Sequence, residues 1–189
     1  MRRAELVRGT GVVVASFAMS QRRTMPVRAE TQIPINPIDV IVARKFYGSR
    51  PASLYVEPIV EASSYYGVSQ DLLPITSMAE SGGGTAGRSW FGLPLSFKTR
   101  EEEIWYVAKL ISGNDPKNPA YKQARDEIQT LQIFNSGRIG GWNDPNYPGK
   151  YSFFKGQLLE LRDRYSIVPE QQSSEPELVE ESEVLDIAE

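Results

Sequence analysis

The sequence predicts a mainly α-helical single domain, with termini of a different composition on either side. Apolar side chains recur at helical spacings between residues 51 and 165, and serines, threonines and glycines stand where helices would begin and end. No stretch shows the sustained apolar–polar alternation of a β-strand. At 189 residues, the chain is long enough for one domain with a hydrophobic core.

The first half of this domain predicts two helices. One is expected over residues 51–66, with Gly67 as its C-terminal stop. The second is expected from Leu72 to about Glu80, with Ser69 as its N-cap. This second segment is apolar on most sides, which predicts a central, buried helix.

The second half predicts three more helices, joined by loops in which functional residues could lie. Thr99 and the acidic residues after it fit a capping box that opens a helix ending near Ile111. A fourth helix is expected over about 120–131. After a loop rich in Gly, Asn and Pro, a last helix is expected over about 150–165.

The termini predict a different organisation. Residues 1–20 combine a basic start with a short apolar stretch, which predicts a signal peptide or a basic leader. That stretch is shorter than the roughly 20 residues that span a bilayer, so no transmembrane span is expected. Residues 21–50 suggest a linker, 51–168 the folded domain, and 169–189 an acidic disordered tail. A signal peptide would place the protein outside the cell or in a bacterial cell envelope.

Composition narrows the chemistry. The chain has no cysteine and no histidine, which excludes Ser–His and Cys–His catalysis and imidazole or thiolate metal sites. If the chain is an enzyme, its proton transfers must therefore come from carboxylates, Lys or Tyr. The net charge is −3, and residues 31–168 hold 15 basic and 14 acidic side chains, without the basic concentration typical of a nucleic-acid binder.

Glu80 is the carboxylate with the most unusual position. It ends an apolar helix and precedes a run of glycines, beginning at Gly82, that would let a bulky substrate approach. Partial burial raises the pKa of a carboxyl group, so such a residue could hold a proton near neutral pH and act as a general acid. The alternative is that Glu80 simply ends its helix at the surface.

Four fragments, in this order, resemble motifs of the lysozyme-like superfamily. The run from Glu61 to Leu73 is similar to the lead-in A-x-x-Y-G-V-x-P-x-L-L. The others are Glu80-Ser81-Gly82, similar to E-S-G; Phe134-Asn135-Ser136-Gly137, similar to Y-N-A/S-G; and Tyr147-Pro148-Gly149-Lys150-Tyr151, similar to a P-x-x-Y ending. Phe91-Gly92-Leu93 falls where the family has an F/W-G-L loop. Over residues 55–165 the nearest resemblance is to soluble lytic transglycosylases and bacterial endo-β-N-acetylglucosaminidase-type domains.

The resemblance implies a lysozyme-like fold with a catalytic cleft, in which Glu80 is the general acid. It also implies a set of substrate-binding candidates: Ser81, Trp90, Phe91, Asn135, Trp142, Tyr147 and Tyr151. Each has an alternative. Ser81 could instead cap a loop, Asn135 could close a local turn, and the aromatic side chains could pack in the core. The sequence departs from the family at Phe134, where a tyrosine is expected, and at Ser89-Trp90, where an asparagine is expected.

These observations predict a glycosidase that cleaves the β-1,4 MurNAc–GlcNAc bonds of peptidoglycan. A hydrolase would need a second carboxylate, for which Glu101, Glu102, Glu103 and Asp144 are candidates, although helix capping and a turn explain these residues better. We therefore favour a transglycosylase, in which Glu80 serves as both acid and base. Neither mechanism implies a cofactor or a metal. A non-catalytic carbohydrate-binding domain of the same fold is the alternative. The oligomeric state is not predicted.

Overall fold

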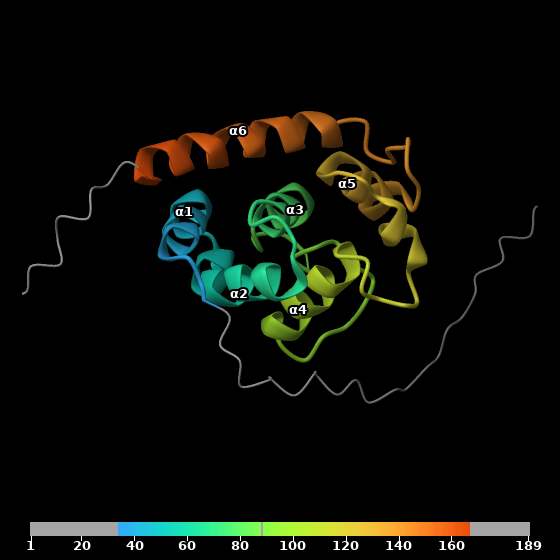
Figure 1. Cartoon of the computed structure of the whole chain (residues 1–189), viewed down its shortest axis with the longest axis horizontal. Helices are drawn as coiled ribbons and strands as arrows, with labels where there is room; N and C mark the ends of the chain where they lie inside the picture. The colour runs from blue at the N-terminus through green and yellow to red at the C-terminus, as the bar shows by residue number, and fades with distance from the viewer. Residues whose placement is uncertain (1–33, 88, 167–189) are drawn as a thin grey trace, which may run out of the picture. The chain divides into compact units, whose positions relative to one another are not determined.

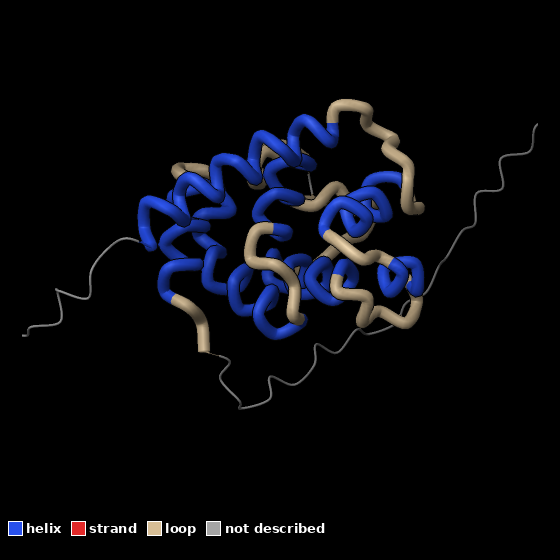
Figure 2. The backbone as a smooth tube through the Cα atoms, turned by 45° about the horizontal axis from the view of Figure 1, so that its top comes forward, coloured by secondary structure: helices blue, strands red, loops and turns tan. Residues whose placement is uncertain are grey.

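The computed structural model describes residues 34–87 and 89–166 (Figure 1). These residues form six α-helices and two short 3₁₀ helices, with no strand among them, which confirms the mainly α prediction (Figure 2). The elements are α1 (Pro37–Tyr47), η1 (Pro51–Tyr55), α2 (Val56–Tyr66), α3 (Leu72–Ser81), α4 (Arg100–Ile111), η2 (Pro119–Gln123), α5 (Glu127–Ser136) and α6 (Tyr147–Ser166).

Helix α3 is the centre of the hydrophobic core. It packs against α6 on one side and against α1, α2 and α4 on the others (Figure 1). Leu73 and Ile75 are fully buried, so the prediction of a central, buried helix is confirmed. Ser69 is not its N-cap, because Asp71 holds that position, and the Ser69 carbonyl accepts the Leu72 N–H at 3.0 Å.

The prediction of a linker over residues 21–50 is wrong for residues 37–47, which form α1. The Asn36 side chain accepts a hydrogen bond from the Ile38 N–H at 3.0 Å and caps this helix, and Pro37 occupies its first turn. Val42 and Tyr47 are buried in the core. Proline is favourable in the first turn of a helix, so the Pro-rich composition marked a helix start rather than a linker.

Helix boundaries match the predictions from η1 to the start of α4. The expected helix over 51–66 is divided into η1 and α2, and Gly67 ends α2 with a left-handed φ of 64°. Thr99 caps α4, since its hydroxyl accepts the Glu102 N–H at 3.1 Å.

The fourth predicted helix, 120–131, is displaced in the structure. Residues 119–123 form η2, and Asp126 then caps α5 by accepting the Gln129 N–H at 2.7 Å. Helix α5 therefore continues to Ser136 and includes Asn135. Helix α6 begins three residues earlier than predicted, at Tyr147.

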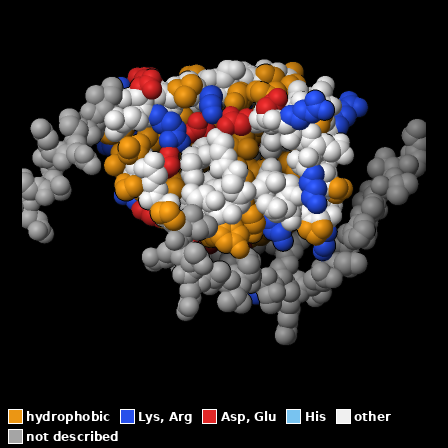
Figure 3. Space-filling model, viewed as in Figure 1, with side chains coloured by type: hydrophobic (Ala, Val, Ile, Leu, Met, Phe, Trp, Pro, Cys, Tyr) orange, Lys and Arg blue, Asp and Glu red, His pale blue; other side chains and the backbone are white. Residues whose placement is uncertain are grey.

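Ion pairs attach α6 to the rest of the domain. Asp71, buried at the start of α3, accepts hydrogen bonds from Arg162 at 2.7 Å and from Lys155 at 2.9 Å. Arg162 also binds Asp39 of α1, and Lys155 also binds Glu127 of α5 at 3.0 Å. In Figure 3, acidic and basic side chains lie intermixed along the α6 edge of this face. We call the set of Asp39, Asp71, Glu127, Lys155 and Arg162 the α6 ion cluster.

The predicted leader (1–20), the linker up to residue 33 and the predicted tail (169–189) lie outside the described residues. Within the described part of the chain, no helix combines the length and apolar character that a membrane crossing requires.

Candidate functional site

Glu80 lies in the last turn of α3 and lines an open pocket of about 360 Å³. The rest of its lining comes from the loop between α3 and α4, namely Ala86, Gly87, Ser89, Gly92 and Leu93. The helix ends immediately beyond, because Gly82 adopts a left-handed φ of 63° and its N–H caps the Met78 carbonyl. The Glu80 side chain is thus partly buried but reaches a solvent-accessible pocket.

The loop packs directly against the Glu80 carboxylate. A Cβ at position 92 would lie 2.4 Å from Glu80 Oε2, and Gly92 has a φ of +67° that other residues adopt rarely. The backbone conformation therefore favours glycine at position 92, and a Cβ there would displace the Glu80 carboxylate. This close contact removes water from one side of the carboxylate.

The glycine run after Glu80 serves packing, not substrate access. Gly82 ends the helix, and a Cβ on Gly84 would lie 2.5 Å from Trp90 Nε1. The open approach to Glu80 comes instead from the small side chains farther along, at Ala86 and Gly87.

Three of the predicted substrate-binding residues belong to the support of this loop. The buried Ser81 hydroxyl accepts the Gly84 N–H at 2.9 Å and donates to the Trp90 carbonyl oxygen at 2.8 Å. Ser81 therefore caps the loop, which is one of its two predicted roles. The prediction that Trp90 and Phe91 line a sugar groove is wrong, because only 4% and 0% of them is exposed. Their rings lie in the hydrophobic core, because burying an aromatic ring stabilises the fold more than leaving it exposed in a surface groove.

Helix α6 brings Tyr147 to the other side of Glu80. Tyr147 is 1% exposed, and Trp142 stacks on its ring with centroids 5.4 Å apart and an angle of 21°. The Tyr147 hydroxyl is close enough to lower the pKa of the Glu80 carboxyl, yet among the described residues it has no hydrogen bond of ordinary geometry. Because the Tyr147 side chain is buried, its hydroxyl can reach Glu80 but not a substrate, and the prediction that Tyr147 lines a sugar groove is wrong.

Asp144 and Lys150 form an ion pair beside the same carboxyl. Lys150 Nζ lies 2.9 Å from Asp144 Oδ2 and 3.4 Å from the carbonyl oxygen of Ala79, the residue before Glu80. Asn135 fixes the loop that carries Asp144, since its side-chain oxygen accepts the N–H groups of Asn143 at 2.7 Å and Asp144 at 3.1 Å. Asn135 thus closes a loop, as in its predicted turn alternative, while supporting the Glu80 region indirectly.

The two carboxyl groups at this site have opposite electrostatic environments. Burial raises the pKa of Glu80 above its ordinary value, and the opposing effects of Tyr147 and Lys150 are smaller. The negative charge of Asp144 acts in the same direction as burial. The hydrogen bond from Lys150 lowers the pKa of Asp144. This arrangement raises the pKa of Glu80 and lowers the pKa of Asp144, which are the directions expected of a general acid and of a base.

Tyr151 does not join this site. Its hydroxyl donates to Glu127 at 2.8 Å, so it extends the α6 ion cluster. Lys150, absent from the sequence-based set, could have been found from its spacing, because residues three apart on a helix share a face and Lys150 follows Tyr147 by three. The contact between Gly92 and Glu80 gave no local signal, because it depends on the path of a loop.

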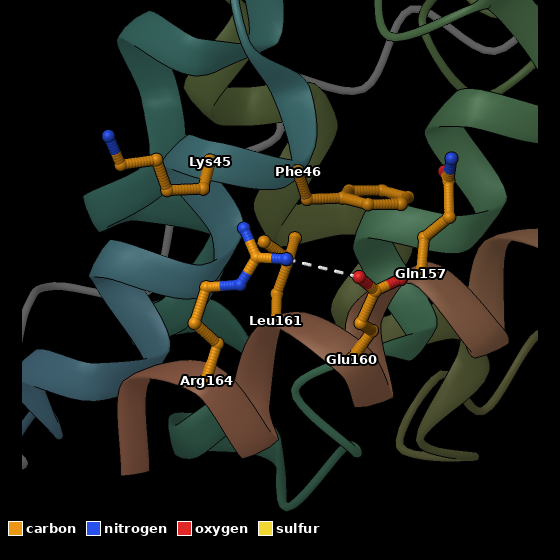
Figure 4. A pocket seen from close by; sticks show the side chains of 6 residues that line it. All are labelled: Lys45, Phe46, Gln157, Glu160, Leu161 and Arg164. Carbon is orange, nitrogen blue, oxygen red and sulfur yellow. Dashed lines mark hydrogen bonds and ion pairs between the residues drawn. The ribbon is translucent and has the colours of Figure 1, made fainter. Parts of the chain in front are cut away.

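A second pocket, of about 250 Å³, lies between α1 and α6 (Figure 4). Its lining residues are Lys45, Phe46, Gln157, Glu160, Leu161 and Arg164. Its one carboxylate, Glu160, is exposed and paired with Arg164 at 3.1 Å. This pocket therefore lacks a partly buried acid of the kind that Glu80 provides. No group of three or more metal-ligating side chains occurs among residues 34–87 and 89–166.

A comparison with protein-family models found no match to this chain, and comparisons with curated proteins and with solved structures found none either.

Proposed function

We propose that the protein is a peptidoglycan-cleaving glycosidase of lysozyme-like fold, with Glu80 as the general acid and the pocket beside it as part of the catalytic cleft. One observation carries the proposal: a partly buried carboxyl group with a raised pKa lines a solvent-accessible pocket. The motif resemblance centred on Glu80-Ser81-Gly82 supports the same residue independently of this geometry.

In the first step, the protonated Glu80 carboxyl donates its proton to the glycosidic oxygen. The bond from the anomeric carbon to that oxygen breaks, the oxygen leaves as a hydroxyl, and Glu80 becomes a carboxylate. The sugar left behind has oxocarbenium character. Tyr147 and Lys150 then help to stabilise the new Glu80 charge, because both lower the pKa of this carboxyl.

Two second steps are compatible with this site. In a transglycosylase, the Glu80 carboxylate accepts the proton of the muramyl 6-hydroxyl as that oxygen attacks the anomeric carbon, which gives a 1,6-anhydro product. In a hydrolase, a second carboxylate directs a water molecule or stabilises the positive charge. Asp144 is the candidate for this second carboxylate, because its negative charge raises the pKa of Glu80.

The test is digestion of purified peptidoglycan by the wild-type chain and by Glu80→Gln, with soluble products measured by mass spectrometry. We expect wild type to release glycan fragments and Glu80→Gln to lose at least about 100-fold in rate, the size expected for a general acid. Glu57→Gln, a change of an exposed glutamate on α2, is the matched control and should retain full activity.

The products distinguish the two second steps. Fragments lighter by one water than reducing-end fragments indicate a transglycosylase, and reducing ends indicate a hydrolase. Release of fragments by Glu80→Gln at the wild-type rate would refute the role of Glu80. Binding of glycan without release by wild type would support the non-catalytic carbohydrate-binding alternative.

A further inference from the structure

Glu103 is a fully buried carboxylate that lies outside the pocket. It stands in the first turn of α4 and is 1% exposed. An ionised carboxylate at this depth is costly unless its oxygens are hydrogen-bonded and its charge is compensated. The contacts that compensate it show what it does.

One carboxylate oxygen of Glu103 accepts hydrogen bonds from the loop between α3 and α4 that lines the pocket. Glu103 Oε1 accepts the Trp90 N–H at 2.7 Å, the Phe91 N–H at 3.2 Å and the Ser89 hydroxyl at 2.5 Å. The other oxygen accepts from Arg100 Nη1 at 2.8 Å, and the Arg100 guanidinium also lies over the Trp90 ring at 5.1 Å.

The loop that Glu103 binds is the one that meets Glu80. Ser89, Gly92 and Leu93 line the pocket, and the Ser89 hydroxyl also accepts the Leu93 N–H at 2.9 Å. At Trp90 the backbone is held from both sides, with its N–H on Glu103 and its carbonyl on Ser81. The path of the loop from residue 89 to residue 93 therefore depends on the Glu103 carboxylate.

We propose that Glu103 is a positioning residue for Glu80: it holds the loop of residues 89–93 so that Gly92 covers one side of the Glu80 carboxyl and excludes water from it. This inference rests on the proposed function, because it explains how the environment of the catalytic carboxyl is maintained. Its structural evidence is the set of contacts between Glu103 and the loop. Glu103 itself does not contact the pocket, so it acts through the loop.

The charged and titratable groups that act on Glu80 directly do not include Glu103, so an effect of Glu103 on Glu80 must pass through the loop. Tyr147 and Lys150 face Glu80 from α6, and Asp144 faces it from the preceding loop. None of these residues bonds to Glu103. If Glu103 is neutralised, Glu80 should change only because the loop loosens and water enters. That change lowers the Glu80 pKa toward its ordinary value, since burial is its largest cause.

The experiment is a ¹³C NMR titration of the Glu80 side-chain carboxyl in wild type, Glu103→Gln and Glu101→Gln. Glu101 is an exposed neighbour in the same helical turn, so its change removes the same charge without touching the loop. Glutamine at 103 has one acceptor oxygen and one donor amide, so its NH₂ must face either the loop donors or the Arg100 guanidinium. We expect the Glu80 midpoint to fall in Glu103→Gln and to stay at the wild-type value in Glu101→Gln.

The same variants give an activity readout if the proposed function holds. Glu103→Gln should then lose about 10- to 100-fold in turnover, because small displacements of a catalytic group have effects of this size. The alkaline limb of its pH–rate profile should move to lower pH. The titration needs no activity, so a chain that cleaves no glycan would refute the proposed function and leave this test intact.

A folded Glu103→Gln whose Glu80 midpoint equals that of Glu101→Gln would overturn the proposal. If Glu103→Gln does not fold, Ser89→Ala replaces it, because it removes one of the same hydrogen bonds. Ser89→Ala should lower the Glu80 midpoint in the same direction by a smaller amount, and an unchanged midpoint would again overturn the proposal.

Discussion

The two ends of α3 carry acidic residues in opposite environments. Asp71, at the N-terminal end, is buried but paired with Arg162 and Lys155, whose hydrogen bonds and charges bring its pKa below the ordinary value despite burial. Glu80, in the last turn, is partly buried with weaker compensation, so burial raises its pKa. The helix dipole acts in the same sense, because it favours negative charge at the N-terminal end and disfavours it at the C-terminal end.

The difference shows that the contact between α3 and α6 has two roles, one in stability and one at the candidate site. Along α6, Lys155 and Arg162 lie over the N-terminal end of α3 and form ion pairs that hold the helices together. Nearer its start, α6 supplies Tyr147, an uncharged group, to the C-terminal end of α3. Burial with strong ion pairs gives Asp71 a lowered pKa in a stabilising cluster, whereas burial with weaker compensation gives Glu80 a raised pKa. Four substitutions test this contrast, from the largest expected effect to the smallest.

Asp71→Asn should have the largest effect, a loss of about 2–4 kcal/mol in the free energy of unfolding near neutral pH, because it leaves cations partly buried with fewer partners. The lowered folded pKa of Asp71 means that its contribution is complete above the pKa of the unfolded chain and disappears as the pH falls through the folded pKa. Urea unfolding of both chains over a pH series measures this. A difference that persists unchanged at strongly acid pH would contradict the ion-pair explanation.

Gly92→Ala should cost about 1–3 kcal/mol in stability, because the new Cβ meets Glu80 Oε2 in a backbone conformation that alanine adopts poorly. It should also displace Glu80 and reduce glycan cleavage. Thermal unfolding and cleavage rates measure the two effects. Gly67→Ala is the matched control, because Gly67 has a similar φ of +64° and a Cβ there meets nothing within 4 Å. Equal stability of the two variants would show that the loop does not press on Glu80.

Tyr147→Phe should leave stability unchanged or raise it by up to about 1 kcal/mol, because it removes a buried hydroxyl that lacks a hydrogen bond of ordinary geometry. Since the Tyr147 hydroxyl lowers the pKa of Glu80, its removal should raise that pKa and move the alkaline limb of the pH–rate profile upward. Tyr65→Phe, on an exposed tyrosine of α2, is the control. A downward movement of the limb would mean that Tyr147 does not act on Glu80.

Glu80→Gln should have a similarly small effect on stability, a gain of up to about 1 kcal/mol near neutral pH, as is common when a functional carboxyl is replaced. The raised folded pKa of Glu80 means that ionisation of the folded chain is unfavourable, so wild-type stability falls as the pH rises through the folded pKa. Below the unfolded pKa both chains are uncharged at this position, and the gain should vanish. Thermal unfolding at acid and neutral pH checks the sign, and a loss at neutral pH would contradict it.

Local patterns in the sequence predicted most of the fold. The central position of α3, the Gly67 stop and the Thr99 cap follow from side chains near one another in the chain, and each is present in the structure. Helix α1 was missed because its prolines resemble those of a linker. Its burial depends on packing against α6, more than 100 residues away in the sequence, as the pairing of Asp39 with Arg162 illustrates.

The candidate site was predictable only in part. Glu80 stood out because an acidic residue ended an apolar helix before glycines. Tyr147 was included as an aromatic side chain, although its hydroxyl, rather than its ring surface, faces Glu80. Trp90 and Phe91 were misassigned because composition does not tell a core ring from a groove ring. Gly92 and Glu103 act through the path of one loop, which no spacing in the sequence specifies.

The most direct test of the central claim is a ¹³C NMR titration of the side-chain carboxyl groups of Glu80 and Asp71 in the wild-type chain, with Glu80→Gln and Asp71→Asn used for assignment. The structure predicts a Glu80 midpoint above the ordinary value for a glutamate and an Asp71 midpoint below that for an aspartate. A Glu80 midpoint at or below the ordinary glutamate value would contradict the claim that this carboxyl retains the proton that an acid catalyst needs.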